Sequence, residues 1–217
     1  MESKELIARR VAREIAPGML VNLGIGLPSL VSNYVPASLG VYFQAENGVI
    51  GLGARPPEGM EDRHLTDAGG GFVSAVPGAA SIDSAMSFGL IRGGHLDMTV
   101  LGGLQVDEAG HLANWKVPGK MVPGMGGAMD LVTGAARVVV AMQHSAKGQS
   151  KIVPKCTLPL TALRRVNLVV TDLAVIEPSS AGLILRERAP GVCIDDIRQA
   201  TEASLIVPSD IPEMLLD

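Results

Sequence analysis

Apolar residues recur at helical spacing at the start of the chain. Four of them fall on one side of a helix predicted over about residues 3–16, and charged residues occupy the other side. The dipeptide Pro17-Gly18 ends this helix, because neither residue favours a helical interior. The four apolar positions are Leu6, Ile7, Val11 and Ile15.

Short apolar runs follow, separated by glycine-rich turns and further helical segments. The stretch MLVNLGIGLPSLVSNYV at 19–35 predicts a strand, a glycine turn and a helix that opens at Pro28. A second strand, GVYFQA, leads to Glu46, and another helix is expected over about residues 83–92. Apolar strands are also predicted at Met98–Gly103, Val138–Met142 and within 166–176. Buried strands alternating with helices are typical of a parallel or mixed sheet covered by helices.

Ligands of such sheets bind beyond the carboxyl ends of the strands, where Gly24 and Glu46 are both expected. Glu46 belongs to the stretch QAENGVIGLG. The local pattern favours a two-residue hairpin turn, with Asn47 and Gly48 at positive φ and Glu46 solvated at its edge. The alternative is a turn that presents the carboxylate for chemistry, and the other glycine-rich loops and the basic segment favour that alternative.

Composition narrows the classes of function. The 217 residues are 47% hydrophobic and 18% charged, and no linker divides them, so residues 1–217 are expected to fold as one domain. Aromatic residues make up 3% and the net charge is −4, which argues against nucleic-acid binding. No apolar stretch reaches membrane-spanning length and the N-terminus does not resemble a signal peptide, so a cytoplasmic protein is expected. Cys156 and Cys193 are expected as reduced interior residues.

The charge is uneven along the chain. Residues 116–155 contain six basic residues and one acidic residue, so this segment carries +5 and the rest carries −9. It is either an anion-facing region or a basic solvated surface. The basic residues are Lys116, Lys120, Arg137, Lys147, Lys151 and Lys155.

Several stretches resemble familiar functional motifs but lack a residue or a structural context that the motif requires. GIGLP lacks the third glycine of a dinucleotide-binding fingerprint, although a helix start after Gly26 offers backbone N–H groups to an anion. Ser87 in AMSFG falls in a helical pattern and not on the strained turn of a nucleophile elbow. The stretch HSAKG is either a base beside a lysine or a surface loop, and the surface loop is preferred. The four histidines are scattered, so no metal site is expected.

Taken together, several segments resemble the β subunit of family I CoA-transferases, of the 3-oxoacid and acetate/acetoacetate type. The resemblance covers most of the chain, and its longest block is highly specific. It implies an α/β three-layer α/β/α sandwich with a mostly parallel or mixed sheet. The matching segments are VNLGIGLP (21–28), ENGVIGLG (46–53), PGAASIDSAMSFGLIRGGHLD (77–97), LANWKVPGKMVPGMGGAMDLV (112–132), HSAKG (144–148) and KCTLPLT (155–161).

The resemblance also implies roles for individual residues. Glu46 would be the nucleophile, and Gly127 would supply a backbone N–H to the oxyanion. Asn22 would contact the CoA thioester region, with Gly26 and Gly126 also placed at the CoA and substrate site. Coenzyme A would be a substrate, with no permanently bound cofactor. A separate α subunit of similar fold would complete the active site in an α2β2 assembly.

The implied reaction is ping-pong transfer of CoA through a glutamyl-CoA thioester. Ala45 stands where many relatives have serine, and Gly70 stands where succinyl-CoA-using relatives often have lysine. The glycine favours the acetate/acetoacetate branch over a succinyl-CoA:3-oxoacid enzyme. Two other possibilities stay open: an acyl-CoA hydrolase that uses the same glutamate, and a non-catalytic ligand-sensing domain of this kind of fold.

Overall fold

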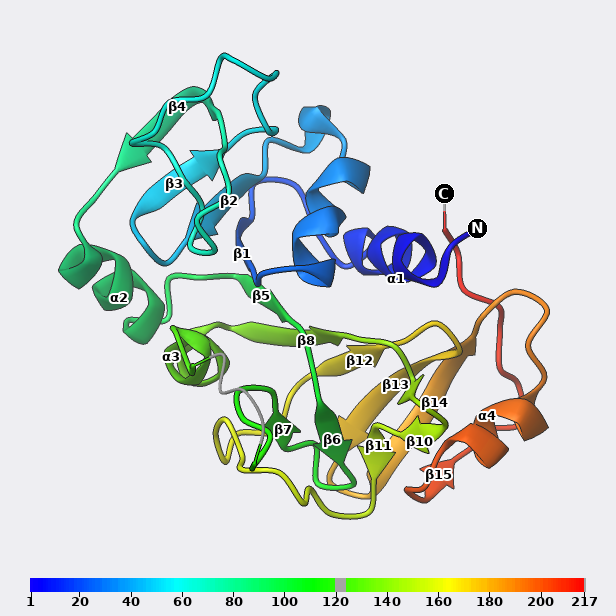
Figure 1. Ribbon diagram of the computed structural model, residues 1–217. Helices are drawn as coiled ribbons and strands as arrows, with labels where there is room; N and C mark the ends of the chain where they lie inside the picture. Colours follow the sequence, from blue (N-terminus) through cyan, green and yellow to red (C-terminus); the bar gives the residue numbers. More distant parts are fainter. Residues whose placement is uncertain (120–123, 217) are drawn as a thin grey trace.

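A ten-stranded mixed sheet forms the centre of the molecule, and the computed structural model describes residues 1–119 and 124–216. Its five central strands, β2, β1, β5, β8 and β12, run parallel, and antiparallel strands adjoin them on both sides (Figure 1). In spatial order the strands are β15 (Leu205–Ile206), β14 (Gly182–Arg188), β13 (Ala174–Ser179), β12 (Leu168–Val170), β8 (Arg137–Ala141), β5 (Met98–Leu101), β1 (Leu20–Leu23), β2 (Tyr42–Ala45), β3 (Val49–Leu52) and β4 (Ala75–Ser81). The prediction of an α/β fold with a mixed sheet is confirmed.

Helix α1 (Ser3–Ala12) and the 3₁₀ helices η1 (Leu27–Tyr34) and η2 (Ala37–Leu39) lie on one side of this sheet. The predicted N-terminal helix is confirmed, although it ends at Ala12, before the expected boundary. The helix expected after the glycine turn forms as 3₁₀ and not as α. Its serine hydroxyls help to explain this, because Ser29 and Ser32 each donate to the carbonyl three residues earlier.

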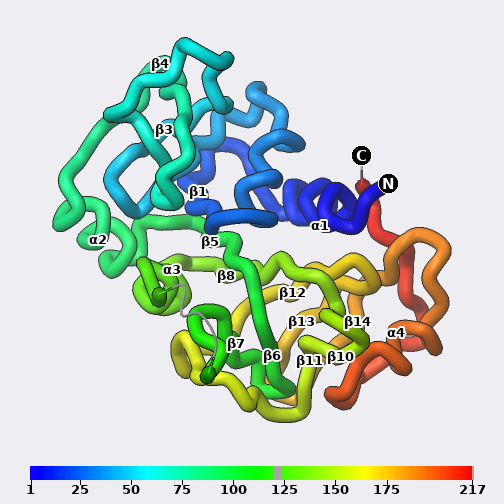
Figure 2. The backbone as a smooth tube through the Cα atoms, viewed as in Figure 1, coloured from blue at the N-terminus to red at the C-terminus, as the bar shows by residue number. Residues whose placement is uncertain are grey.

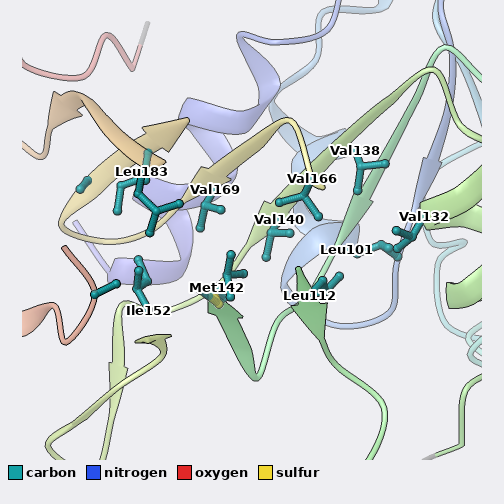
Figure 3. Packing of buried hydrophobic residues seen from close by; sticks show 14 of the residues in the cluster. Leu101, Leu112, Val132, Val138, Val140, Met142, Ile152, Val166, Val169 and Leu183 are labelled. Carbon is teal, nitrogen blue, oxygen red and sulfur yellow. The ribbon is translucent and has the colours of Figure 1, made fainter. Parts of the chain in front are cut away.

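The other face packs against helices α2 (Ser84–Arg92), α3 (Ala128–Gly134) and α4 (Ile194–Ala200) and a second, three-stranded sheet. That sheet contains β6 (Gln105–Asp107), β7 (Leu112–Ala113) and β11 (Ile152–Val153), and a short hairpin pairs β9 (Ser145–Ala146) with β10 (Gln149–Ser150). Val138 and Val140 of β8 join this core, as Figure 3 shows, whereas Val139 joins the core under α1. Strand β8 is therefore buried on both faces, as its continuous apolar sequence predicts.

The C-terminal segment returns to the first helix (Figure 2). Met214 joins the same hydrophobic cluster as Ile7 of α1. A buried ion pair also ties α1 to β14: the Arg10 guanidinium donates from Nε and Nη2 to the two carboxylate oxygens of Glu187 at 2.6 and 2.7 Å. Among the described residues, no helix has the length and apolar character needed to cross a bilayer.

Both cysteines are free, but they are less buried than the sequence suggested. Cys193 is exposed because it caps the start of α4, where its sulfur accepts from the backbone N–H of Asp196. Cys156 is partly buried, and burial, followed by the nearby charge of Asp107, raises the pKa of its thiol to about 12. A thiol with that pKa stays protonated at neutral pH, so Cys156 is a poor nucleophile.

His144 of the HSAKG stretch is fully buried, which corrects the expectation of a surface loop at this residue. Its Nε2 lies 2.9 Å from the Thr201 hydroxyl, and that hydroxyl donates to Ile197 O at 2.6 Å. Nδ1 lies 2.9 Å from the Thr171 hydroxyl, which is also 3.1 Å from Ala174 O. The neutral ring links the end of β8 to the β12–β13 turn and to α4, and burial lowers the pKa of His144 to about 4.

This histidine makes the stability of the fold depend on pH. The unfolded chain takes up a proton near the ordinary pKa of 6.5 and the folded chain only near 4, so stability present above pH 6.5 is lost as the pH falls toward 4. Between pH 7.5 and pH 5 we expect His144 to account for a loss of about 2 kcal/mol in the free energy of unfolding. Urea denaturation at the two pH values measures it. His144→Gln should remove this part of the pH dependence, whereas the exposed-residue control His95→Gln should retain it; identical dependence in both variants would contradict the assignment.

Candidate active site

Glu46 begins the turn that joins β2 to β3. The two strands pair antiparallel with Ala45 opposite Val49, so the turn has three residues and not the two expected from Asn-Gly. Gly48 has φ of 120°, and Asn47 is not among the residues at positive φ. A Cβ on Gly48 would lie 2.0 Å from Ile82 O, so the turn packs directly against the backbone ahead of α2. Only glycine fits there.

The same turn is anchored on its exposed side. Asn47 Nδ2 donates to Thr66 O at 2.8 Å, which ties the turn to the loop between β3 and β4. That loop is shaped by Asp67, whose Oδ1 accepts from the backbone N–H groups of Gly69 and Gly71 at 2.8 Å. The side chain of Ile25, from the GIGLP turn, lies against Gly69. Two of the predicted glycine-rich loops are therefore neighbours near Glu46.

The carboxylate of Glu46 is partly buried and faces the end of β1. Asn22 Nδ2 donates to Glu46 Oε2 at 3.2 Å, and it also lies 2.9 Å from Gln44 Oε1 and 3.1 Å from Gln44 O. Strands β1 and β2 are adjacent and parallel, with Asn22 beside Gln44 in the register. Because the carboxyl ends of these parallel strands are neighbours, Asn22 and Glu46 lie side by side.

Two further buried hydroxyls join this group. Gln44 Nε2 donates to Ser87 Oγ at 2.8 Å, and Thr99 Oγ1 donates to Asn22 Oδ1 at 3.2 Å. Ser87 lies on α2 as predicted, and it has no exposed surface. The four polar residues Asn22, Gln44, Ser87 and Thr99, all 0% exposed, form what we call the amide relay.

Gln44 and Thr99 were not among the site residues expected from the sequence. The sequence does contain a sign of their role, because each is a polar residue inside an otherwise apolar strand, as Asn22 is. Parallel pairing puts Asn22 next to both of them. Three polar residues in neighbouring apolar strands indicate a buried polar network, since each must find a hydrogen-bond partner away from water.

Gly127 also lies beside the Glu46 side chain. It lies just before α3, and a Cβ on it would be 3.2 Å from Glu46 Cγ and 3.4 Å from Phe88 Cζ. Within the described part of the chain, its N–H donates to no other residue. Helix α3 is held close to α2, because Gly134 leaves room for Ile91 O, where a Cβ would lie at 2.1 Å.

Two other predicted residues are not joined to Glu46 by any contact among the described residues. Gly26 has φ of 86° and precedes η1, and Gly126 has φ of 51° beside Gly127. Among the described residues, no heavy atom lies within 4 Å of the position that a Cβ on either glycine would take.

The basic segment does not form one surface. Arg137 opens β8 and pairs with Glu14, whereas Lys147 lies in the β9–β10 turn beyond the other end of β8. Lys151 donates to Gly103 O, and burial lowers its pKa. Lys120 lies outside the described residues. Within the described ranges, no group of three His, Cys, Asp or Glu side chains is arranged to hold a metal ion.

The family model for coenzyme A transferase matches residues 4–200. The chain is 55% identical over 215 residues to the beta chain of an acetate CoA-transferase from Haemophilus influenzae, covering 99% of this chain and 96% of that protein. It is 49% identical over 205 residues to one of the subunits of succinyl-CoA:3-ketoacid coenzyme A transferase from Helicobacter pylori, covering 94% and 99%.

Among solved structures, the fold resembles an acyl-CoA transferase apoenzyme from Escherichia coli O157:H7, with a TM-score of 0.80 at 22% identity. The match covers 99% of this chain and 43% of that one, so this chain spans less than half of that protein. At this identity the likeness concerns the fold.

The close contact at Gly48 generates a stability prediction. Gly48→Ala should lower the free energy of unfolding by clearly more than Gly59→Ala. Both positions have positive φ, which costs alanine about 1 to 2 kcal/mol, but only Gly48 adds a clash with backbone. Gly59 is the matched control, because nothing lies within 4 Å of its Cβ position. Urea denaturation compares the two, and equal losses would show that the Ile82 contact is unimportant.

Proposed function

The chain belongs to the coenzyme A transferase family, and from that premise we propose that it is the catalytic β subunit of an enzyme that moves CoA from a short-chain acyl-CoA to a carboxylic acid. Glu46 is the nucleophile. The observation that carries this proposal is one carboxylate beside both a side-chain amide and a glycine backbone. Asn22 donates to Glu46 Oε2, and Gly127 lies so close that a Cβ on it would be 3.2 Å from Glu46 Cγ.

The first step is attack of Glu46 on the thioester carbonyl of the acyl-CoA. A carboxylate is a weak nucleophile, so the site must hold the carbonyl close and stabilise the oxyanion that forms. We assign this oxyanion to the backbone N–H of Gly127. One such donor contributes about 3 to 4 kcal/mol of transition-state stabilisation in comparable sites.

Collapse of this oxyanion releases CoA thiolate and leaves an acyl-glutamyl anhydride. The thiolate then attacks the glutamyl carbonyl, which frees the donor's carboxylic acid and leaves a Glu46–CoA thioester. An acceptor carboxylate then attacks the Glu46–CoA thioester, which gives a new anhydride and CoA thiolate. The thiolate attacks the acyl carbonyl of this anhydride, which releases the new acyl-CoA and regenerates Glu46. Each step exchanges one activated acyl bond for another, so no oxidant, metal or net proton transfer is needed.

Water must be kept from both intermediates, since hydrolysis would end the cycle. Val49 and Ile50 follow the Glu46 turn and are only partly buried in this chain alone. Exposed apolar side chains lie on nearby elements: Phe72 and Val76 at or before β4, Met86 on α2 and Met129 on α3. These surfaces support a site completed by a second polypeptide. We therefore propose an α2β2 assembly with a separate α subunit, in keeping with relatives that are named as single subunits of CoA-transferases.

For the substrate we favour acetate or acetoacetate over succinate. Succinyl-CoA carries a second carboxylate, and Gly70 provides no cation to meet it. The 55% identical relative is named an acetate CoA-transferase, whereas the succinyl-CoA enzyme is 49% identical. The loop that contains Gly70 is tied to the Glu46 turn through Thr66. A succinyl-CoA:3-oxoacid enzyme and an acyl-CoA hydrolase are the alternatives that the experiments below distinguish.

Replacing the nucleophile tests the mechanism. Glu46→Gln should abolish transfer, with a loss in kcat of at least about a thousandfold, because the amide cannot form the anhydride. Borohydride added after acyl-CoA should reduce the wild-type thioester to the alcohol at Glu46, which peptide mass spectrometry locates. Glu58→Gln, on the neighbouring exposed loop, is the control and should keep activity and labelling. Labelling at another carboxylate, or an active Glu46→Gln enzyme, would overturn the assignment.

Reconstitution tests the partner and the substrate. The chain alone should be inactive, and co-purification with its α subunit should restore transfer from acetoacetyl-CoA to acetate faster than from succinyl-CoA to acetoacetate. The assay follows each acyl-CoA product by chromatography. Release of free acid without an acceptor, at a rate equal to transfer, would indicate a hydrolase. A complex that binds CoA without turnover would indicate a ligand-sensing protein.

A further inference from the structure

Asn22 contacts the proposed nucleophile, and the side chains of two buried residues behind it hold its carboxamide in place. Gln44 Oε1 accepts from Asn22, and Gln44 Nε2 donates to Ser87 Oγ. We propose that Gln44 and Ser87 are positioning residues for acyl transfer, which act on Glu46 through Asn22. The proposal rests on the function proposed above, because it requires Glu46 to be the reacting group.

The orientation of Asn22 follows from acceptors whose identity is unambiguous. Its Nδ2 faces the backbone carbonyl of Gln44 and the carboxylate of Glu46, and neither can donate when Glu46 is ionised. An oxygen placed there would repel both. The other end of the carboxamide, Oδ1, accepts from the Thr99 hydroxyl. The amino group of Asn22 must therefore point toward Glu46.

The orientation of Gln44 then follows from that of Asn22. Facing an amino group, Gln44 must present its own oxygen, which leaves its Nε2 pointing toward α2. This Nε2 is buried and needs an acceptor, and Ser87 Oγ lies at 2.8 Å. Asn22 and Ser87 together favour this orientation, and without the serine hydroxyl the buried Nε2 of Gln44 would lose its acceptor. A flipped Gln44 would turn its amino group against Asn22.

The relay matters chemically when CoA thiolate attacks the glutamyl carbonyl of the anhydride. A C–S bond forms, and the carbonyl electron pair moves onto the glutamyl oxygen. Return of that pair breaks the bond to the bridging oxygen and expels the acyl carboxylate. We assign the oxygen that takes up this charge to Oε2, the atom that Asn22 contacts, and the attacking oxygen to Oε1. Asn22 thus serves a second oxyanion, distinct from the one assigned to Gly127.

Helix α2 gives this arrangement a common support. Ser87 holds the amide relay, and the next residue, Phe88, packs against the backbone of Gly127. Further along the helix, Arg92 pairs with Asp130 of α3 at 2.7 Å. One helix therefore supports both proposed donors, Asn22 through Gln44 and Gly127 through Phe88. A small displacement of these donors is expected to be costly, since misplacement of about 1 Å can slow an enzyme about a hundredfold.

The test uses the enzyme assembled with its α subunit and the variants Ser87→Ala and Gln44→Met. We expect each to lower kcat about tenfold or more while KM for acyl-CoA changes little, because neither residue faces the substrate. The rate at which the Glu46–CoA adduct appears in a single turnover without acceptor, followed by intact-protein mass, should fall by a similar factor. Ser84→Ala, an exposed position on the same helix, is the matched control and should behave as wild type.

Counting active sites separates positioning from simple folding. For Ser87→Ala and Gln44→Met, the final amount of Glu46–CoA adduct formed in a single turnover gives the fraction of active protein, and kcat is expressed per active site. A purely structural role would lower the melting temperature and the number of active sites, with kcat per active site unchanged. That result would overturn the proposal.

The two proposals fail in different ways. An active Glu46→Gln enzyme would overturn the assignment of Glu46 as the nucleophile, and this inference with it. An inactive Glu46→Gln enzyme, with Ser87→Ala and Gln44→Met at wild-type kcat and adduct rate, would overturn only the positioning role.

Discussion

The buried carboxamide of Asn22 has two hydrogens on Nδ2 and faces three oxygen acceptors at the carboxyl end of β1, and the geometry around Glu46 depends on these bonds. Two of the acceptors belong to Gln44 and the third to Glu46, the proposed nucleophile. Because the group is closed to water, every donor and acceptor must be satisfied within it. Thr99 and Ser87 complete the set from β5 and α2. The result is a carboxylate held at a strand end by hydrogen bonds that reach into the core.

Close backbone contacts are the second requirement of this site. Gly48 packs against Ile82 O, Gly127 against the Glu46 side chain, and Gly134 against Ile91 O. In each case a side chain would occupy space that the neighbour already fills. The first contact fixes the turn, the second places the Gly127 backbone beside the Glu46 side chain, and the third holds α3 against α2. Glycine serves here by its small size, and only at Gly48 also by its positive φ.

The stability of the fold and the proposed acyl-transfer chemistry depend on different polar groups. His144 is buried as a neutral ring between two threonine hydroxyls, and it links β8 to α4 far along the chain from Glu46. Arg10 and Glu187 tie the first helix to β14. Neither set faces the Glu46 turn. Protonation of His144 by acid can therefore weaken the fold at a place outside the Glu46 site.

The sequence by itself determined the mixed sheet and the helix over the first residues, because apolar periodicity and glycine placement are local properties. Its likeness to CoA-transferase β subunits identified the family. Only the tertiary structure decided that the turn has three residues, that His144 is interior, and that Gln44, Ser87 and Thr99 stand behind Asn22. These outcomes depend on which strands become neighbours and which backbone atoms meet, and residues distant in sequence supply the partners. A pattern can show that Ser87 lies on a helix, but only packing shows that it faces Gln44.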